Sequence, residues 1–578
     1  MLTYSLDDRG ELSLYEYLYR CIRSDIENGA IAPGEKLPSK RSFARHLGVS
    51  LITVEGAYSQ LVAEGYVRAE PRRGYFACNL RATGISPDKR RYLGASDYLE
   101  PATQSGDVEI APEEGLAQAY ASLSHAGRRD GLPSNENESR IGDIDDAPIE
   151  VDRPSGEALV ADFTGASVPL GLFPYASWAK SVRDALSRES ERDLAGETGY
   201  AGTERLRTAI ASHLRGFRGM EVDPECIVIG AGSQVLYSWL VQLLGRDLRY
   251  GVEDPGYLRL SRIYEANDVS LSHIPLDGNG IDMASVVEHG VDVLHLMPSH
   301  QFPTGIVTSI SRRYELLGWA SAEESRYLIE DDYDCEFRLT GRPIPSLQSI
   351  DASGKVIYTN TFTKSLGPAF RIGYMILPPS LAKRFKRKLG FYSCTVSAID
   401  QLALARFIES GDYERHVNRL RTHYRQVRDA LIAALQESSF GERLSIEEED
   451  AGIHFLMGIA VDAGGAAKSR DLAPQGPARR YRFDDDGADA PSRTLQDAAR
   501  LRWEAEFARA AEEGGVRIVA LSSFYSGNAA AEQGPVRRFL VSYGGIEPES
   551  LAPSPLWSMR FALRMRQCAS AYSSIRRK

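Results

Sequence analysis

The sequence predicts an α/β protein with a small N-terminal domain, a long polar segment and a large domain in which strands alternate with helices. Three observations lead to this prediction. Residues 12–78 contain short amphipathic helices that end in glycine turns. Residues 79–157 are polar and show little apolar periodicity. From Leu159 onward, short apolar runs alternate with helical patterns, as expected of a sheet covered by helices.

Composition narrows the class of protein further. The chain has 578 residues and a formal net charge of -11, which argues against general coating of nucleic acid. Its six cysteines are scattered without metal-type spacing, so we expect free thiols and no metal site. The N-terminus lacks a signal-peptide pattern, and no apolar run approaches the roughly 18 residues of a membrane span. We therefore expect a cytoplasmic protein with no membrane partner.

The N-terminal domain reads as a winged helix-turn-helix. Residues 12–28 repeat an apolar residue every fourth position, and residues 37–47 form a second helix. A tight turn at Gly48 leads into a third helix over 51–64, and residues 66–78 read as two short strands. Residues 36–78 carry seven basic and three acidic side chains, against the acidic average of the chain. Helix, short turn, helix and basic hairpin together favour a DNA-binding function.

This domain resembles the GntR-type DNA-binding domain. The resemblance rests on Leu37, Pro38, Ser39, Arg41, Leu47, Gly48, Val49, Ser50, Thr53, Val54, Ala57, Tyr58, Leu61, Glu64, Gly65, Tyr66 and Gly74. It implies contact with operator DNA through Ser39, Lys40, Arg41, Ser50, Thr53 and Tyr58, and through a wing formed by Arg72, Arg73 and Gly74. Leu51 departs from the family, which often has a basic residue there. The alternative is a small interaction module whose basic residues are only a solvated face.

Residues 79–157 are expected to form a flexible acidic linker. Residues 107–157 alone carry 13 acidic and 4 basic side chains. Such a segment gives the DNA-binding domain a long tether. Its acidity could compete with DNA for the basic wing, or it could simply be solvated.

The chemistry of the large domain centres on residues 361–371. Lys364 lies between Thr361 and Thr363, and Arg371 follows seven residues later. Asp331 ends an apolar strand 33 residues before Lys364. A lysine able to form a Schiff base, an acid for a pyridinium nitrogen and a phosphate-binding arginine together indicate a pyridoxal phosphate (PLP) site. Each feature alone would be a solvated lysine or an acidic turn, so the argument rests on their joint occurrence.

Two further segments fit a PLP site. The apolar strand over 226–229 runs into a glycine-rich turn over 230–234 and then a helix, which is a natural phosphate cradle. Tyr257 follows another strand end, where an aromatic side chain could stack on a flat ring. The alternative for Tyr257 is an anchoring residue in a Pro-Gly turn.

These segments together resemble the MocR-type (GabR-like) regulators. The motifs are residues 298–305, 329–334 and 361–371. The resemblance implies a fold-type I PLP-dependent transferase with a large α/β domain and a small C-terminal α+β lobe, assembled as a homodimer. It also implies that Lys364 carries the cofactor. Asp331 would then keep the pyridine nitrogen protonated. Tyr333 would form a hydrogen bond with the ring hydroxyl, and Tyr257 would stack on the face of the ring. The phosphate would be bound by Ser233, Gln234, Thr361, Thr363 and Arg371.

The same resemblance suggests where an effector binds. Arg259, His300 and Arg538 would face it, with Gln301 beside His300. Family members that bind an amino-acid carboxylate often have an arginine on the last strand. Leu540 stands at that place, with Arg538 two residues away on the same strand face.

The predicted domains are 1–78, 79–157 and 158–578, with a flexible insertion at about 462–497 in the last. We expect a DNA-binding transcription regulator that senses an amine, an amino acid or PLP itself through an aminotransferase-like domain. The alternative is a PLP-dependent aminotransferase with an appended DNA-binding domain, and residual transamination stays open. A homodimer would present two DNA-binding domains to two half-sites.

Overall fold

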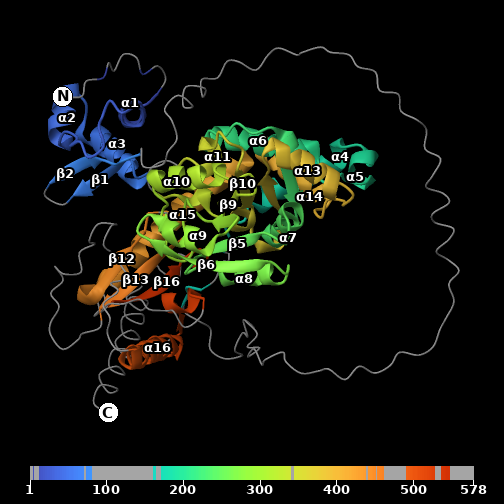
Figure 1. The fold of residues 1–578 in the computed structure, drawn as a ribbon. Coiled ribbons are helices and arrows are strands. Elements are labelled where there is room, and N and C mark those ends of the chain that lie inside the picture. Colours follow the sequence, from blue (N-terminus) through green and yellow to red (C-terminus); the bar gives the residue numbers. More distant parts are fainter. Residues whose placement is uncertain are drawn as a thin grey trace, which may run out of the picture. The chain divides into compact units, whose positions relative to one another are not determined.

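The computed structural model describes residues 4, 9, 12–70, 73–80, 161–164, 169, 171–339, 344–437, 441–450, 452–460, 490–513, 515–526 and 536–546 (Figure 1). Almost all of the predicted linker and most of the predicted insertion lie outside these residues. None of the helices in the described ranges combines the length and the apolar character that crossing a bilayer requires.

The N-terminal domain is a winged helix-turn-helix, as predicted. It contains α1 (Leu14–Asn28), α2 (Lys40–Leu47) and α3 (Leu51–Ala63), followed by the antiparallel strands β1 (Val67–Glu70) and β2 (Gly74–Ala77). Serine side chains at Ser13, Ser39 and Ser50 accept backbone N–H groups and so begin the three helices. The apolar faces of the helices meet in one core around Ile22, Phe43 and Leu61.

The large domain is built on an eight-stranded sheet in the order β4-β11-β10-β9-β8-β5-β6-β7. Strands β10, β9, β8, β5 and β6 are parallel, whereas β11 is antiparallel to both of its neighbours and β7 is antiparallel to β6. The bounds are β4 (Ile227–Gly230), β5 (Arg249–Asp254), β6 (Ser270–Asp277), β7 (Gly280–Ile281), β8 (Val293–Leu296), β9 (Tyr327–Asp331), β10 (Val356–Thr361) and β11 (Gly373–Ile376). This confirms the predicted α/β class.

Helices cover both faces of this sheet. Inward side chains of α7 (Ser233–Leu244), α8 (Leu258–Glu265) and α13 (Pro379–Leu389) form one core with alternate strand residues. On the other face, α6 (Glu204–Arg218) and α14 (Ala398–Glu409) cover one half, while α9 (Met283–His289) and α10 (Ile310–Ser321) cover the other. The remaining helices of this domain are α4 (Tyr175–Arg188), α5 (Glu191–Ala195), α11 (Leu347–Ile350) and α12 (Thr363–Leu366). The strands are buried on both sides, which explains their continuous apolar runs.

The C-terminal lobe packs helices against a small antiparallel sheet of order β12-β13-β16-β15. Its elements are α15 (Asp412–Gln436), β12 (Leu444–Glu447), β13 (His454–Ala460), α16 (Ala490–Glu513), β15 (Val519–Ala520) and β16 (Val536–Ser542), and β14 (Val516–Arg517) pairs with β3 (Ala161–Asp162). Helix α16 begins at Ala490, inside the predicted insertion. The chain that follows α16 is broken at Ile518 into two short strands, because β14 and β15 pair with different partners.

Candidate functional site

The predicted cofactor residues converge at one end of the large sheet. Strands β9 and β10 are parallel neighbours in which Thr359 lies opposite Asp331. Lys364 follows the end of β10 on the short helix α12, and α7 begins directly after β4. Carboxyl ends of parallel strands meet at one sheet edge, which is where open α/β sheets bind ligands.

The turn between β4 and α7 forms an anion-binding cradle with Arg371. Helix α7 begins at Ser233 without a side-chain cap, so the N–H groups of its first turn face outward. The Arg371 guanidinium reaches across to the Ala231 carbonyl at 3.3 Å and to Gln234 Oε1 at 3.5 Å. A Cβ atom on Gly232 would lie only 2.6 Å from Arg371 Nη2, so glycine is needed for this approach. Free N–H groups beside a guanidinium are suited to a phosphate.

Arg371 is held in an unusual backbone conformation. Its φ of 50° lies in the left-handed region, which non-glycine residues seldom adopt. Such a conformation costs on the order of 1 kcal/mol and tends to occur at ligand-binding positions. The chain therefore places this guanidinium by a specific, strained turn at the entrance of β11.

Asp331 is buried and oriented by two further side chains. The Tyr237 hydroxyl donates a hydrogen bond of 2.5 Å to Asp331 Oδ2. His295 Nε2 lies 3.6 Å from the same oxygen, and the Tyr264 hydroxyl lies 2.7 Å from His295 Nδ1. Burial raises the pKa of Tyr264 well above its usual value, so this hydroxyl stays protonated beside His295 Nδ1. Tyr237 and His295 therefore both fix the position of the Asp331 carboxyl group.

Lys364 lies half-buried at the start of α12. Burial lowers the pKa of its amine, and the nearby Asp334 carboxylate opposes this shift. A lowered pKa increases the fraction of neutral amine, which is the nucleophilic form that attacks a carbonyl. The environment of Lys364 therefore suits Schiff-base chemistry.

His300 lies in a buried cluster beside Tyr333. His300 Nδ1 is 2.9 Å from Asp334 Oδ2 and 3.2 Å from the Tyr333 hydroxyl. The ring of His454, on β13, stacks on His300 with centroids 4.2 Å apart and planes 28° from parallel. Ligand atoms of His300, Asp334 and His454 lie within 4.8 Å of one another. Two nearly parallel stacked rings do not direct their lone pairs to one tetrahedral ion, so we do not assign a metal to this cluster.

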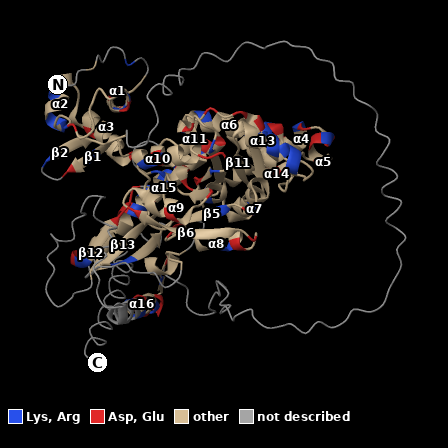
Figure 2. Cartoon of the chain, viewed as in Figure 1, with Lys and Arg blue, Asp and Glu red and all other residues tan. Residues whose placement is uncertain are grey.

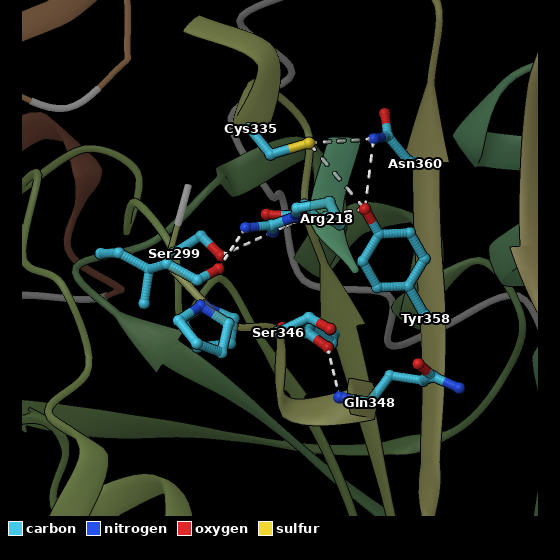
Figure 3. A network of polar contacts seen from close by, with 12 residues as sticks. Arg218, Ser299, Cys335, Ser346, Gln348, Tyr358 and Asn360 are labelled. Atoms are coloured by element: carbon cyan, nitrogen blue, oxygen red, sulfur yellow. Dashed lines mark hydrogen bonds and ion pairs between the residues drawn. The ribbon is translucent and has the colours of Figure 1, made fainter. Parts of the chain in front are cut away.

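A buried polar network links the two loops that carry these residues (Figure 3). Arg218, the last residue of α6, forms a fully buried ion pair with Asp332. It also donates to Ser299 Oγ at 3.2 Å and to the Ile344 carbonyl, while the Tyr358 hydroxyl donates to Asp332 Oδ2 at 2.7 Å. Asp332 separates Asp331 from Tyr333, and Ser299 precedes His300. One guanidinium thus fixes both loops at the back of the site.

The buried carboxyl group of Glu253 lies close enough to Asp331 for the two charges to interact. Glu253, near the end of β5, accepts a hydrogen bond of 3.0 Å from the Met297 backbone N–H. Burial raises its pKa to about 8, with a small further contribution from the Asp331 charge. Glu253 is therefore largely protonated at neutral pH and adds little negative charge beside Asp331.

The predicted effector side is more apolar than the resemblance suggested. Leu540 belongs to a buried apolar cluster with Leu456 and Leu521, against which Phe302 and Phe524 pack. Arg538 forms an ion pair of 3.1 Å with Glu447 Oε2, so its charge is already balanced within the lobe.

Arg259 is exposed at the start of α8. The Arg259 and Arg371 charges oppose the rise that burial gives to the pKa of Tyr257. Arg259 and Arg371 therefore supply positive charge close to Tyr257.

Most of the predicted DNA-contact residues are exposed or half-buried, whereas Tyr58 is buried. Arg41 and Arg73 are exposed, and Lys40 lies 3.5 Å from Glu55 and over the Tyr75 ring. Ser39 and Ser50 are exposed and cap α2 and α3, the Thr53 hydroxyl lies beside Ser50, and Gly74 begins β2 with a φ of 113°. The prediction that Tyr58 contacts DNA is wrong. Its side chain is fully buried in the domain core, and its hydroxyl donates to the Pro38 carbonyl. Tyr58 supports the fold and offers no side chain to DNA, and Arg72 lies outside the described residues.

Several residues at the site were not found from the sequence. Tyr237 and His454 come from a helix and a strand far from the motifs, and Tyr237 is 94 residues from Asp331. His295 lies on β8, three residues before the motif 298–305. No role was predicted for Arg218, or for Asp332 within the motif 329–334. The one available signal was Asp332 itself, because an acid next to Asp331 in a buried strand end needs a cation.

Comparisons with known proteins agree with both domains. Residues 14–76 match the family of bacterial regulatory proteins called gntR, and residues 169–526 match aminotransferase class I and II. The HTH-type transcriptional regulator YdeL of Bacillus subtilis is 36% identical over 454 residues, covering 78% of this chain and 86% of the relative. The HTH-type pyridoxine biosynthesis transcriptional regulator PdxR of Corynebacterium glutamicum is 31% identical over 427 residues, covering 74% and 80%.

MocR of Rhizobium meliloti, described as a probable rhizopine catabolism regulatory protein, is 30% identical over 453 residues, covering 78% of this chain and 83% of the relative. The crystal structure of an archaeal alanine:glyoxylate aminotransferase matches with a TM-score of 0.55 and 21% identity, covering 73% of this chain and 92% of that one, which supports the fold alone. A gntR-type domain joined to an aminotransferase-like domain defines an HTH-type transcriptional regulator. This chain belongs to the family of such regulators that includes MocR and PdxR.

Proposed function

We propose that the large domain binds PLP at Lys364 and that this cofactor site senses a small amine, an amino acid or PLP itself, to control operator binding by the N-terminal domain. The observation that carries the proposal is the convergence of three features at one sheet edge. These are a lysine of lowered pKa, a buried and hydrogen-bonded Asp331, and the anion cradle of Gly232 and Arg371.

The residues fit PLP group by group. The cradle and the hydroxyls of Thr361 and Thr363 would hold the phosphate, and Asp331 would pair with the pyridine nitrogen. Tyr333 would form a hydrogen bond with the ring hydroxyl, and Tyr257 would stack on a face of the ring. When bound, PLP supplies a carbonyl that Lys364 and incoming amines can compete for, which is what an amine sensor requires. Arg259 and His300 are the proposed contacts to the effector.

The first experiment is a titration of the purified full chain with PLP, followed by visible absorbance. We expect wild type to develop the band of PLP attached to a lysine, and Lys364→Ala to show only free PLP. Lys180→Ala, which removes an exposed lysine on α4, is the control and should behave as wild type. An unchanged band in Lys364→Ala would remove Lys364 from the site.

The second candidate function is aminotransferase activity. It is favoured by the intact Lys364 and Asp331, and disfavoured by the neutralised Arg538 and the apolar setting of Leu540. Conversion of bound PLP to pyridoxamine phosphate by an amino acid, with return on adding a keto acid, would favour this enzyme reading. A spectral shift without turnover would favour a sensor.

Assembly follows from the regulator proposal. Two copies of the chain would bring two winged helix-turn-helix domains to a pair of operator half-sites, with spacing set by the homodimer. An effector would then act by shifting the population of arrangements that fit both half-sites.

A further inference from the structure

Helix α13 carries an unusual concentration of positive charge. Its eleven residues include Lys383, Arg384, Lys386, Arg387 and Lys388, and no acidic residue. All five cationic side chains are exposed, while Leu381, Phe385 and Leu389 anchor the helix in the core. Figure 2 shows this positive charge along α13. With 1.5 Å of rise per residue, five charges lie within about 8 Å of helix.

These charges are not balanced by neighbouring acids. In the described part of the chain, no carboxylate forms an ion pair with any of the five, whereas arginines on other surface helices have such partners, for example Arg415 with Asp412 and Arg502 with Glu506. The Arg384 guanidinium donates only to the Leu244 carbonyl, at 3.5 Å. Among the elements that contact α13, a short turn carries Asp223 and Glu225, and α7 is followed by Asp247. Glu225 is already paired with Arg207.

The positive charge of α13 contrasts with the negative charge of the whole chain. The whole chain has a formal net charge of -11, so a run of five unpaired cations is not the general character of its surface. A solvated helix face normally intersperses both signs of charge. A face with one sign only favours a partner that carries the opposite sign at high density.

We propose that α13 is a second, sequence-independent DNA-contact surface, which binds the phosphates that flank the operator. The proposal rests on DNA binding by the N-terminal domain, because that domain brings the duplex to the protein. Duplex DNA carries one negative charge per about 1.7 Å of its axis. The acidic segment 107–157 spreads 13 acidic side chains over some fifty residues and is therefore a weaker match.

Counterion release gives the expected size of the effect. Each phosphate contact adds about 0.9 to the slope of log affinity against log salt concentration. Loss of three contacts should therefore lower the slope by about 2.7, but only on DNA that is long enough to reach α13.

The test uses the full chain and two duplexes. One carries only the operator mapped by footprinting, and the other adds about 30 flanking base pairs on each side, or about 100 Å of duplex. The variant is Lys383→Glu, Lys386→Glu and Arg387→Glu together. A neutral triple, with glutamine at the same positions, guards against misfolding of the charge-reversed chain. The matched control is Arg215→Glu, Arg415→Glu and Arg502→Glu, which reverses three exposed arginines elsewhere.

We expect both α13 triples to bind the short operator as wild type does. On the long duplex they should lose about tenfold or more in affinity at low salt, with a slope lower by about 2.7. The control triple should match wild type on both duplexes. That pattern would support a phosphate-binding role for α13.

Three results would overturn the proposal. Equal affinity and slope for wild type and both α13 triples on the long duplex would show that α13 does not touch DNA. Tighter binding of both duplexes by the triples would show that α13 holds the acidic linker of this chain instead. Failure of wild type to bind even the short operator would remove the regulator proposal itself, and with it the partner of α13.

Discussion

At the scale of single residues, Arg218 illustrates how the loops that carry Asp331 and His300 are held in place. Its guanidinium pairs with Asp332 where both side chains are almost fully buried. We expect Arg218→Met to destabilise the fold by about 3–5 kcal/mol, because it leaves Asp332 as an unpaired buried charge. Urea denaturation measures the change. Arg215→Met on the same helix is the control, since its exposed pair with Glu221 should be worth less than about 1 kcal/mol.

Two further observations would check this account of Arg218. Arg218→Met combined with Asp332→Leu should be more stable than Arg218→Met alone, because the double variant removes the Asp332 charge that the single variant leaves without its partner. Arg218 also holds the pKa of Asp332 below its usual value near 4, so the pair contributes fully at neutral pH and is lost as the pH falls through the lowered pKa. Equal stability of Arg218→Met and wild type would contradict the assigned role.

The sequence was sufficient to propose Lys364 and Asp331 for the cofactor site, but not the side chains that support Asp331. Lys364 and Asp331 could be selected because a strand end, a lysine and an arginine follow one another in a known order. Tyr237 and His295 could not, since they reach Asp331 only through the packing of α7 and β8 against β9. Tyr58 was misassigned, because its spacing on α3 suits a recognition helix while its face points into the core.

At the scale of elements, the start of α7 offers a direct test of the proposed cofactor site. Gly232 has a φ of 82°, and a Cβ there would collide with the Arg371 guanidinium. We expect Gly232→Ala to weaken PLP binding by about tenfold or more, since the strain of a left-handed alanine is about 1 kcal/mol and the guanidinium is displaced as well. Absorbance titration gives the Kd.

The control for this prediction lies on α6, which covers the other face of the sheet. Gly216 in α6 has open space around its Cα and no left-handed conformation, so Gly216→Ala should leave PLP binding unchanged. If Gly232→Ala bound PLP as tightly as wild type, the phosphate would lie away from this turn.

Elements were predicted best where local chemistry defines them. The three serine-capped helices of the N-terminal domain and the β4-turn-α7 unit follow from caps, glycines and apolar periodicity. The small sheet of the C-terminal lobe did not follow, because β13 pairs with β16 across a long stretch of sequence. The break at Ile518 has the same origin, since pairing with β3 and with β16 is decided by tertiary contacts.

At the scale of the whole molecule, a gntR-type domain and an aminotransferase-like domain occur in one chain. Their order could be predicted from motifs alone, because each domain carries its own local pattern. Regulation then requires that ligand binding at Lys364 changes how strongly the chain binds its operator.

The most direct test of this coupling follows the visible spectrum and operator affinity together, while the PLP-loaded full chain is titrated with amines and amino acids. We predict that a ligand which shifts the absorbance band of wild type also changes its operator affinity, typically by 5- to 150-fold. Lys364→Ala should show neither response while retaining basal operator binding. A ligand that changed the operator affinity of Lys364→Ala and wild type equally would contradict the account, as would a band shift with no change in DNA binding.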